Sequence, residues 1–257
     1  ILRLASYPTI EESGRGLHCY EVSKTKKTRV IYLTWFKKKC TPFKIPSNVK
    51  LYVRKFYTIE NPKKSNFIIK FFFNLYRIFR IITFSLNGVY LLIRYKVDII
   101  HIHSPMFILV SFFGHLVGKK NFITFHGEDF FRIKNKKWYK LLSKSIDKVF
   151  SISPRYIKTL KKIHNKDIIQ IYNGINTSVY RNLNKSRKKQ IIAVANFKKQ
   201  KGLNFLIEGF NLFIKNNPTL NHYKLIIAGR GILFDEINNM INKEKLDDNI
   251  NLVGQKN

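Results

Sequence analysis

Short apolar runs recur along the chain, and segments with helical periodicity separate most of them. In the first part of the sequence, the runs typical of buried strands are residues 1–7, 29–34, 51–53, 97–101, 121–125, 148–151 and 168–171. Apolar side chains at helical spacing lie between several of these runs, for example Ile157, Leu160 and Ile163. Continuous apolar strands that alternate with helices predict a parallel sheet covered by helices on both faces.

The rest of the chain repeats this plan on a smaller scale. Strand-like runs at residues 190–195, 225–228 and 250–253 alternate with two helical patterns, the second at residues 232–241. The first of these helices has an apolar face made of Leu203, Leu206, Ile207, Phe210 and Phe213. We therefore predict an α/β fold of two Rossmann-like domains that face each other across a cleft.

The boundary between the predicted domains lies near residue 175. Asn173-Gly174 is a pair that favours a turn, and a basic run without periodicity follows it. Asn-Gly taken alone is no more than a turn, and its place between two α/β patterns is what makes it a boundary. The predicted organisation is an N-terminal domain at residues 1–175, a linker at residues 176–189 and a C-terminal domain at residues 190–257.

Residues 63–95 are unusually apolar for a helix of a globular protein. Their polar side chains form a narrow stripe at helical spacing: Lys63, Asn66, Lys70, Asn74 and Arg77. One interpretation is a helix or helix pair packed on the first sheet. The other is a monotopic helix whose aromatic side chains enter the lipid headgroup region while Lys70, Arg77 and Arg80 meet anionic lipid. A membrane-spanning helix is disfavoured, because those charges would lie near the bilayer centre.

Charge is the extreme feature of the composition. The 257 residues include 48 Lys and Arg against 15 Asp and Glu, a formal charge of +33, and 45% hydrophobic residues suffice for real cores. Such a charge suggests an acidic partner, which could be nucleic acid, a diphosphate or an anionic membrane. The basic residues are spread along the whole chain, so the charge is equally consistent with a compositional bias. Nucleic acid is disfavoured, because no aromatic motif is interleaved with the basic residues.

The cysteines and the chain ends give weaker indications. Cys19 and Cys40 have neither disulfide-framework nor metal-site spacing, which favours a reducing, cytoplasmic setting. No signal peptide and no uncharged apolar stretch of about 18 residues is present. The chain begins inside a strand pattern without a methionine, from which we expect a fragment of a longer protein.

In the first domain, candidate chemistry follows two strands at their carboxyl ends, where α/β sheets bind ligands. Residues 11–18 form a loop with Gly14 and Gly16 that opens into a helix, and free backbone N–H groups there favour an anion. A simple tight turn is the alternative. His126 directly follows the strand at residues 121–125, and Gly127 lets a ligand approach the backbone. We interpret His101 and His103 as structural.

In the second domain, three successive strands end in small or basic residues. Lys201 precedes Gly202 and a helix, where its charge would add to the helix dipole at a diphosphate; a solvated lysine is the alternative. Gly229 and Gly231 follow the next strand, and Gln255 follows the last. Together these ends predict a nucleotide pocket.

The ordered set of motifs resembles the retaining, nucleotide-sugar-dependent glycosyltransferases of family 4, which have the GT-B fold. The resemblance extends from the Gly14 loop through HGED at His126, YNGINTSVYR at Tyr172, KG at Lys201, AGRG at Ala228 and NINLVGQK at Asn249. It implies transfer of a sugar from a nucleotide-diphosphate donor to a glycolipid or polysaccharide acceptor, as in cell-envelope synthesis, with no metal or other cofactor. It also implies a protein of the cytoplasm, peripheral at the inner face of the membrane.

The resemblance also assigns roles to individual residues. His126 would lie beside the transferred sugar as the catalytic residue, and Lys201 would neutralise the diphosphate. Gly14 and Gly16 would lie near the diphosphate and the acceptor. The turn that contains Gln255 would hold the base, and Gly229 and Gly231 are the further donor-binding residues.

Two departures from the family pattern affect the prediction. Asn196 occupies the position of an arginine that usually assists the KG lysine, so that Lys198 is its possible replacement. The family's E-x7-E pair is expected after the last strand, whereas Glu236 and Glu244, which have this spacing, precede it and are interpreted as a solvated helix face. We therefore expect a truncated second domain with impaired turnover. A basic nucleic-acid-binding or membrane-docking protein without catalysis is the alternative.

Overall fold

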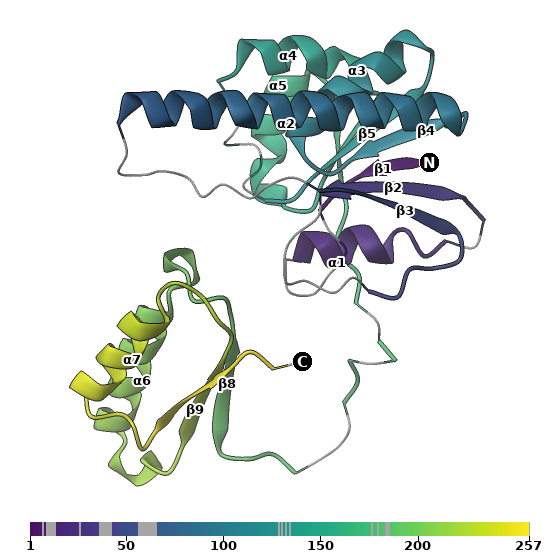
Figure 1. Ribbon diagram of the computed structural model, residues 1–257. Coiled ribbons are helices and arrows are strands. Elements are labelled where there is room, and N and C mark those ends of the chain that lie inside the picture. The colour runs from purple at the N-terminus through teal and green to yellow at the C-terminus, as the bar shows by residue number, and fades with distance from the viewer. Residues whose placement is uncertain are drawn as a thin grey trace. The chain divides into compact units, whose positions relative to one another are not determined.

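The computed structural model describes residues 1–6, 8, 14–25, 27–35, 43–55, 66–127, 129, 131, 133, 135–175, 177–178, 180–182 and 186–256. They form two compact units, unit 1 from Ile1–Asn176 and unit 2 from Thr177–Asn257 (Figure 1). The predicted linker therefore falls at the start of unit 2. Each unit has its own hydrophobic core and is described separately.

Unit 1 is built on a seven-stranded parallel sheet with strand order β3-β2-β1-β4-β5-β6-β7. The strands are β1 (Leu2–Leu4), β2 (Val30–Trp35), β3 (Val49–Arg54), β4 (Ile99–Ile102), β5 (Lys120–Phe125), β6 (Lys148–Ser151) and β7 (Ile168–Gln170). Each strand contains or overlaps a run identified in the sequence. The order is that of a doubly wound Rossmann sheet, in which the chain reverses direction next to β1.

Side-chain alternation on the strands separates two hydrophobic layers. On β1, Leu2 and Leu4 belong to the large core, whereas Ala5 belongs to a small cluster on the other face with Cys19 and Tyr32. Helix α1 (Gly14–Glu21) covers the small cluster, and the helices α2 (Phe67–Arg94), α3 (Ile108–Leu116), α4 (Lys137–Leu142) and α5 (Ile157–His164) lie on the opposite side of the sheet (Figure 1). The predicted two-sided cover is thus confirmed in unit 1.

Helix α3 has no counterpart among the helices predicted from the sequence. Its sequence, ILVSFFGHL, is apolar on every side and therefore lacks the polar face that reveals an amphipathic helix. The helix packs closely on β4, because a Cβ atom on Gly114 would come within 2.1 Å of the Ile100 side chain. The close packing of α3 on β4 therefore depends on the absence of a side chain at Gly114.

Residues 67–94 form one continuous helix, α2, that has two different halves. Its C-terminal half packs on unit 1 through the buried residues Phe84, Ser85, Gly88, Leu91 and Leu92. Its N-terminal half exposes most of its apolar side chains, among which Phe67 is 81% exposed. The packed half agrees with the first sequence interpretation, a helix packed on the first sheet, and the exposed half leaves the second interpretation as a prediction. None of the described helices, α2 included, combines the length and apolarity that a membrane crossing requires.

Unit 2 contains a three-stranded parallel sheet with strand order β10-β9-β8. Its strands are β8 (Gln190–Val194), β9 (Lys224–Ala228) and β10 (Ile250–Gly254), and its helices are α6 (Leu203–Asn216) and α7 (Phe234–Lys243). Both helices lie on the same face of the sheet (Figure 1). In the described part of unit 2 the other face is open, since Ile192 and Val194 of β8 are 59% and 81% exposed.

Candidate functional site

A cluster of histidines lies at the carboxyl edge of the sheet of unit 1. His103 follows β4, His126 follows β5, and His18 extends from α1. The Nδ1 atom of His103 is 3.0 Å from the Nε2 atom of His126. The ring centroid of His18 lies 4.9 Å from that of His126, with the rings edge to face. Three segments far apart in the sequence thus place imidazoles around one point.

An ion pair holds two of these segments together. The guanidinium of Arg15, on α1, donates to the Asp129 carboxylate at 2.7 Å, and the Asp129 side chain is buried. This contact fixes the start of α1 beside the loop that contains His126. Arg3, on β1, is also buried and donates to the carbonyl oxygen of Cys19. The site therefore holds two guanidinium groups, and Asp129 offsets the charge of one.

The histidines of the cluster are uncharged at neutral pH. Burial first, and then the neighbouring His18 and Arg15, lower the pKa of His126 to about 3. Burial likewise keeps the pKa of His101 and of His103 well below the usual range. A low-polarity setting disfavours the charged imidazolium, and nearby cations add to this effect. Each ring therefore has one N–H donor and one acceptor nitrogen.

His103, which the sequence analysis interprets as structural, lies next to the predicted site residue His126. His103 contacts His126 directly, and its ring lies 4.2 Å from that of His101, whose Nε2 is 2.8 Å from the Thr124 hydroxyl. The sequence contained a signal for this contact. His101 and His103 are two residues apart, so their side chains lie on the same face of an extended segment. The strands that lead to His103 and His126, β4 and β5, are parallel neighbours and end at the same edge of the sheet.

Gly14 and Gly16 lie in the first turn of α1 rather than in a loop before it. The first turn of a helix has free backbone N–H groups, so the predicted preference for an anion still applies to this position. The preceding residues 9–13, and Glu128 beside His126, are outside the described residues. Gly127 adopts a positive φ of 69°, and a Cβ atom there would meet no atom of the described residues within 4 Å. Space for an approaching ligand is therefore present next to His126.

In unit 2, Lys201 is exposed and ends a short 3-10 turn, Lys199–Lys201, directly before α6. Gly202, in the left-handed conformation with φ of 63°, forms the N-cap of α6 without a side-chain capping bond. Lys201 thus lies next to the free N–H groups of the helix. Lys198 is also exposed, at the start of the same turn. Two cations and a helix N-terminus form an arrangement that can bind phosphate.

The close approach of neighbouring backbone requires glycine at positions 229 and 231, which the sequence did not reveal. A Cβ atom on Gly229 would lie 1.9 Å from the carbonyl oxygen of Ala195, and one on Gly231 would lie 2.4 Å from that of Phe197. Backbone hydrogen bonds join the same segments, since Phe197 N–H donates to the Arg230 carbonyl and Gly229 N–H to that of Gly254. The ends of β8, β9 and β10 therefore form one connected rim, which Gln255 follows as an exposed residue.

Glu236 and Glu244 do not form a pair of donor-binding type in this fold. Glu236 is exposed in the first turn of α7, and Glu244 follows the last turn, where it accepts a hydrogen bond from Asn211 at 2.8 Å. Both lie before β10, in agreement with their sequence interpretation as helix-surface residues.

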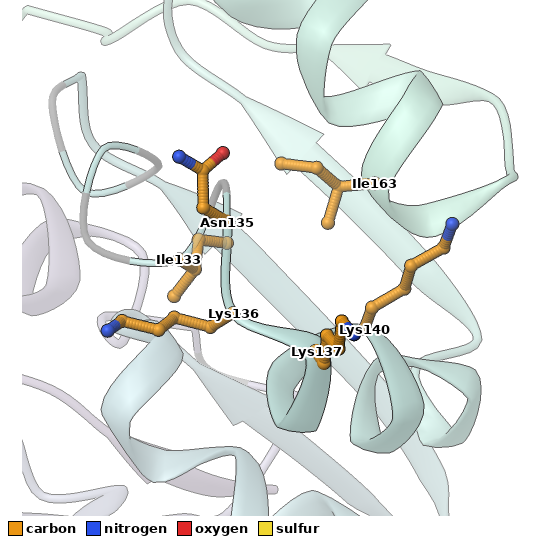
Figure 2. Close-up of a pocket in the computed structure, with 6 residues that line it drawn as sticks. All are labelled: Ile133, Asn135, Lys136, Lys137, Lys140 and Ile163. Atoms are coloured by element: carbon orange, nitrogen blue, oxygen red, sulfur yellow. The ribbon is translucent and has the colours of Figure 1, made fainter.

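A pocket of about 190 Å³ lies beside α4 in unit 1 and is lined by Ile133, Asn135, Lys136, Lys137, Lys140 and Ile163 (Figure 2). The Lys136 side chain extends away from the other labelled side chains (Figure 2). The cations of this pocket therefore do not converge on one point, and we do not assign it as the site.

Comparisons with known proteins identify the family. A family model described as Glycosyltransferase Family 4 matches residues 49–179, and one described as Glycosyl transferases group 1 matches residues 176–257. An uncharacterized glycosyltransferase of Methanocaldococcus jannaschii is 29% identical over 168 residues, which are 62% of this chain and 44% of that protein. The chain thus spans less than half of the length of this relative.

Solved structures show the same fold. Sucrose-phosphate synthase from Thermosynechococcus elongatus has a TM-score of 0.67 at 12% identity, over 100% of this chain and 70% of that one. A mutant of S. aureus TarM in complex with fondaparinux, α-GlcNAc-glycerol and UDP has a TM-score of 0.53 at 20% identity, over 67% of this chain and 37% of that one. Because one family model matches residues 49–179, half of the chain, and the second matches residues 176–257, the chain belongs to the family 4 glycosyltransferases, transferases with the GT-B fold.

Proposed function

We propose that this chain is part of an enzyme that transfers a sugar, with retention at the anomeric carbon, from a nucleotide-diphosphate donor to a glycolipid or polysaccharide acceptor. The observation that carries the proposal is His126, which follows β5 within a polar cluster at the carboxyl edge of a Rossmann sheet. UDP in the TarM complex supports a nucleotide donor. The membrane surface described below supports a lipid-linked acceptor.

Stabilising the leaving diphosphate is the main electrostatic task of such a transfer, because negative charge grows on its oxygens as the sugar departs. In unit 2, Lys201 and the N-terminus of α6 supply positive charge, and Lys198 takes the place of the arginine that Asn196 replaces. In unit 1, the first turn of α1 offers backbone N–H donors. Gly229, Gly231 and Gln255 belong to the rim on which the nucleotide would rest.

The proposed role of His126 is hydrogen bonding to the transferred sugar. Its imidazole is uncharged, so that it orients a hydroxyl group without adding charge to the reacting centre. A group with a pKa of about 3 is too weak a base to abstract a hydroxyl proton at neutral pH. Retention without a strong base agrees with a mechanism in which the departing diphosphate itself receives the acceptor's proton. The transfer then needs no metal cofactor.

Calorimetry with UDP and GDP tests the donor site. We expect saturable binding of one of them to this chain, and weaker binding, by about tenfold, to Lys201→Ala, because one charge-assisted contact is lost. Lys215→Ala is the matched control, since Lys215 lies in the last turn of the same helix. Equal binding to all three proteins would remove Lys201 from the diphosphate site.

The stereochemical part of the proposal has its own test. Proton NMR of the glycosidic product formed from an α-linked donor reports the anomeric configuration of the new bond. An α product supports retention, and a β product would show inversion. The same assay measures turnover of this chain, which we expect to be impaired, because its 257 residues contain no E-x7-E pair after β10.

A second part of the proposal is docking on an anionic membrane through the outer face of α2. Exposed apolar residues, mostly three or four positions apart, form a stripe along this face. We name seven of them, which are 46–68% exposed, the α2 stripe: Ile68, Phe72, Leu75, Phe79, Ile82, Leu86 and Ile93. By helical geometry the stripe lies opposite the buried residues Phe84 and Leu91. An apolar strip of this length is typical of helices that lie in the headgroup region.

Of the three cations predicted to meet the lipid, Lys70 and Arg77 are exposed and Arg80 contacts the protein. Arg80 stacks 4.8 Å from the ring centre of Trp35, at the end of β2, and is thereby engaged with the protein. Exposed lysines on the neighbouring helix α4, Lys137 and Lys140, accompany its exposed apolar residues Trp138 and Leu141. Helices α2, α3 and α4 lie in one layer (Figure 1) and contain no acidic residue. This charge pattern attracts an anionic bilayer, whereas a second copy of the chain would be repelled.

Vesicle co-sedimentation tests the docking. We expect binding to phosphatidylglycerol-containing vesicles and about tenfold weaker binding to vesicles of phosphatidylcholine alone. Phe79→Glu and Leu86→Glu in the α2 stripe should abolish binding, and Ile232→Glu, at an exposed apolar residue of unit 2, should not. A stable dimer in sedimentation velocity that Leu86→Glu dissociates would assign the stripe to self-association instead.

A further inference from the structure

The histidine cluster of unit 1 has the geometry of an incomplete metal site. One ring nitrogen each of His18, His103 and His126 lies within 4.8 Å of those of the other two. The closest pair, in His103 and His126, is separated by 3.0 Å. The ring of His18 stands edge to face to both partners, at centroid distances of 4.9 Å to His126 and 5.8 Å to His103. These three rings therefore surround a common point.

We propose that His18, His103 and His126 bind a divalent transition-metal ion, in the first place Zn²⁺, and that the ion inhibits sugar transfer. Three imidazoles that leave a fourth position to water are a known ligand set of open zinc sites. Nitrogen ligands around a tetrahedral zinc ion lie roughly 3.3 Å apart, given Zn–N bonds of about 2.0–2.1 Å. The pair at 3.0 Å already has this separation, and His18 completes the set by a shift of its side chain on α1.

The surroundings of the cluster support this set of ligands. The Asn173 side chain hydrogen-bonds His18, which is the type of outer contact that orients metal-binding imidazoles. The Arg15–Asp129 ion pair fixes α1, and with it His18, to the segment that contains His126. In the described part of the chain, the buried Nε2 atom of His103 has no hydrogen-bond partner. This atom lies on the other side of the ring from the Nδ1 atom that faces His126, so it can carry the ring proton when Nδ1 binds an ion.

The charges around the cluster determine how tightly we expect the ion to bind. The charge of Arg15 is offset by Asp129, but buried Arg3 raises the cost of placing a cation near His103. No carboxylate among the described residues joins the three imidazoles as a ligand. The site is therefore weaker than a structural zinc site and reversible. It suits an inhibitory ion rather than a cofactor, which agrees with a transfer mechanism that needs no metal.

Inhibition is the part of the inference that rests on the proposed function. If His126 hydrogen-bonds the transferred sugar, an ion bound to the same imidazole occupies the acceptor nitrogen and the space that the sugar requires. Zinc and nucleotide sugar should then compete. Binding of the ion itself depends only on the three histidines of unit 1.

Cobalt absorption spectroscopy on the whole chain tests the metal site without reference to activity. Titration with Co²⁺ should give visible d–d bands that saturate at one equivalent and disappear when Zn²⁺ is added. His18→Ala and His126→Ala should each weaken binding by more than about tenfold. His115→Ala and His222→Ala are the matched controls, since both side chains are exposed, and should bind as the unmodified chain does.

Two results would overturn the metal site: no saturable cobalt spectrum, or a spectrum that both His18→Ala and His126→Ala retain. His18→Gln, at a partly exposed helix position, replaces either alanine variant that circular dichroism shows to be unfolded. In the transfer assay, zinc should inhibit, a chelator should restore the rate, and donor sugar should weaken the inhibition. Cobalt binding without zinc inhibition would leave the metal site standing and refute the shared position with the sugar.

Discussion

At the scale of single residues, the notable feature of His126 is that its buried imidazole is uncharged at neutral pH. The low pKa follows from desolvation first and from His18 and Arg15 second. The consequence for function is a hydrogen-bonding rather than a proton-accepting residue. The sequence located His126 through its place after an apolar strand, but it could not reveal the neighbouring rings that share its environment.

His126→Ala in the complete enzyme should lower the transfer rate by about 100-fold or more, because a preorganised hydrogen bond is lost at the reacting sugar. The melting temperature should change little, since Gly127 and the end of β5 keep their backbone contacts. His115→Ala, on the exposed side of α3, is the control. Near-normal transfer by His126→Ala would remove this residue from the catalytic role.

His164 should make the stability of the folded chain depend on pH. It is buried at the end of α5, its Nε2 lies 3.4 Å from the Tyr139 hydroxyl, and burial together with Lys166 lowers its pKa from 6.5 to about 4. The unfolded chain therefore binds this proton more readily than the folded one does, so stability falls as the pH drops from about 6.5 to about 4.

His164→Gln should consequently reduce the loss of unfolding free energy between pH 7 and pH 5, measured by urea denaturation at both values. The exposed His115→Gln should leave that difference unchanged. Identical pH dependence in the unmodified chain and in His164→Gln would show that His164 does not take up a proton on unfolding.

At the scale of the elements, the close approach of the segments that follow β8 and β9 requires glycine at positions 229 and 231. Gly229→Ala should destabilise unit 2 by at least about 1–3 kcal/mol, because φ is 146° and the added Cβ would meet the Ala195 carbonyl. Gly209→Ala, in the exposed interior of α6 with no atom within 4 Å, should instead stabilise by up to about 1 kcal/mol. Chemical denaturation monitors both. Equal effects would refute the close approach of the two loops.

Helices α2 and α3 show how far periodicity predicts an element. A narrow polar stripe identified α2 but did not reveal that Arg80, one of its basic residues, stacks on Trp35. Helix α3 gives no amphipathic signal, because apolar side chains such as Phe113 and Leu116 also occupy its exposed side. Sequence periodicity therefore reveals a helix only where one of its sides is polar, and it does not show what that side contacts.

At the scale of the whole molecule, the separate cores of the two units predict separate unfolding. Ile100 of β4 and Ile207 of α6 are fully buried, each in the core of its own unit. Ile207→Ala should cost about 2–5 kcal/mol. Hydrogen exchange followed by mass spectrometry should show faster exchange in unit 2 peptides only, and Ile100→Ala should affect unit 1 peptides only. Acceleration in both units by either variant would reveal one cooperative core.

The sequence by itself determined the α/β class, the positions of the parallel strands and the family, because apolar runs, glycine turns and motif order are local properties of the chain. The tertiary structure alone decided that His18 and His103 join His126, that Arg15 pairs with Asp129, and that Gly229 serves loop packing. Parallel strands far apart in sequence bring their carboxyl ends to one edge. Contacts made there depend on strand order and on helix orientation, which no local pattern encodes.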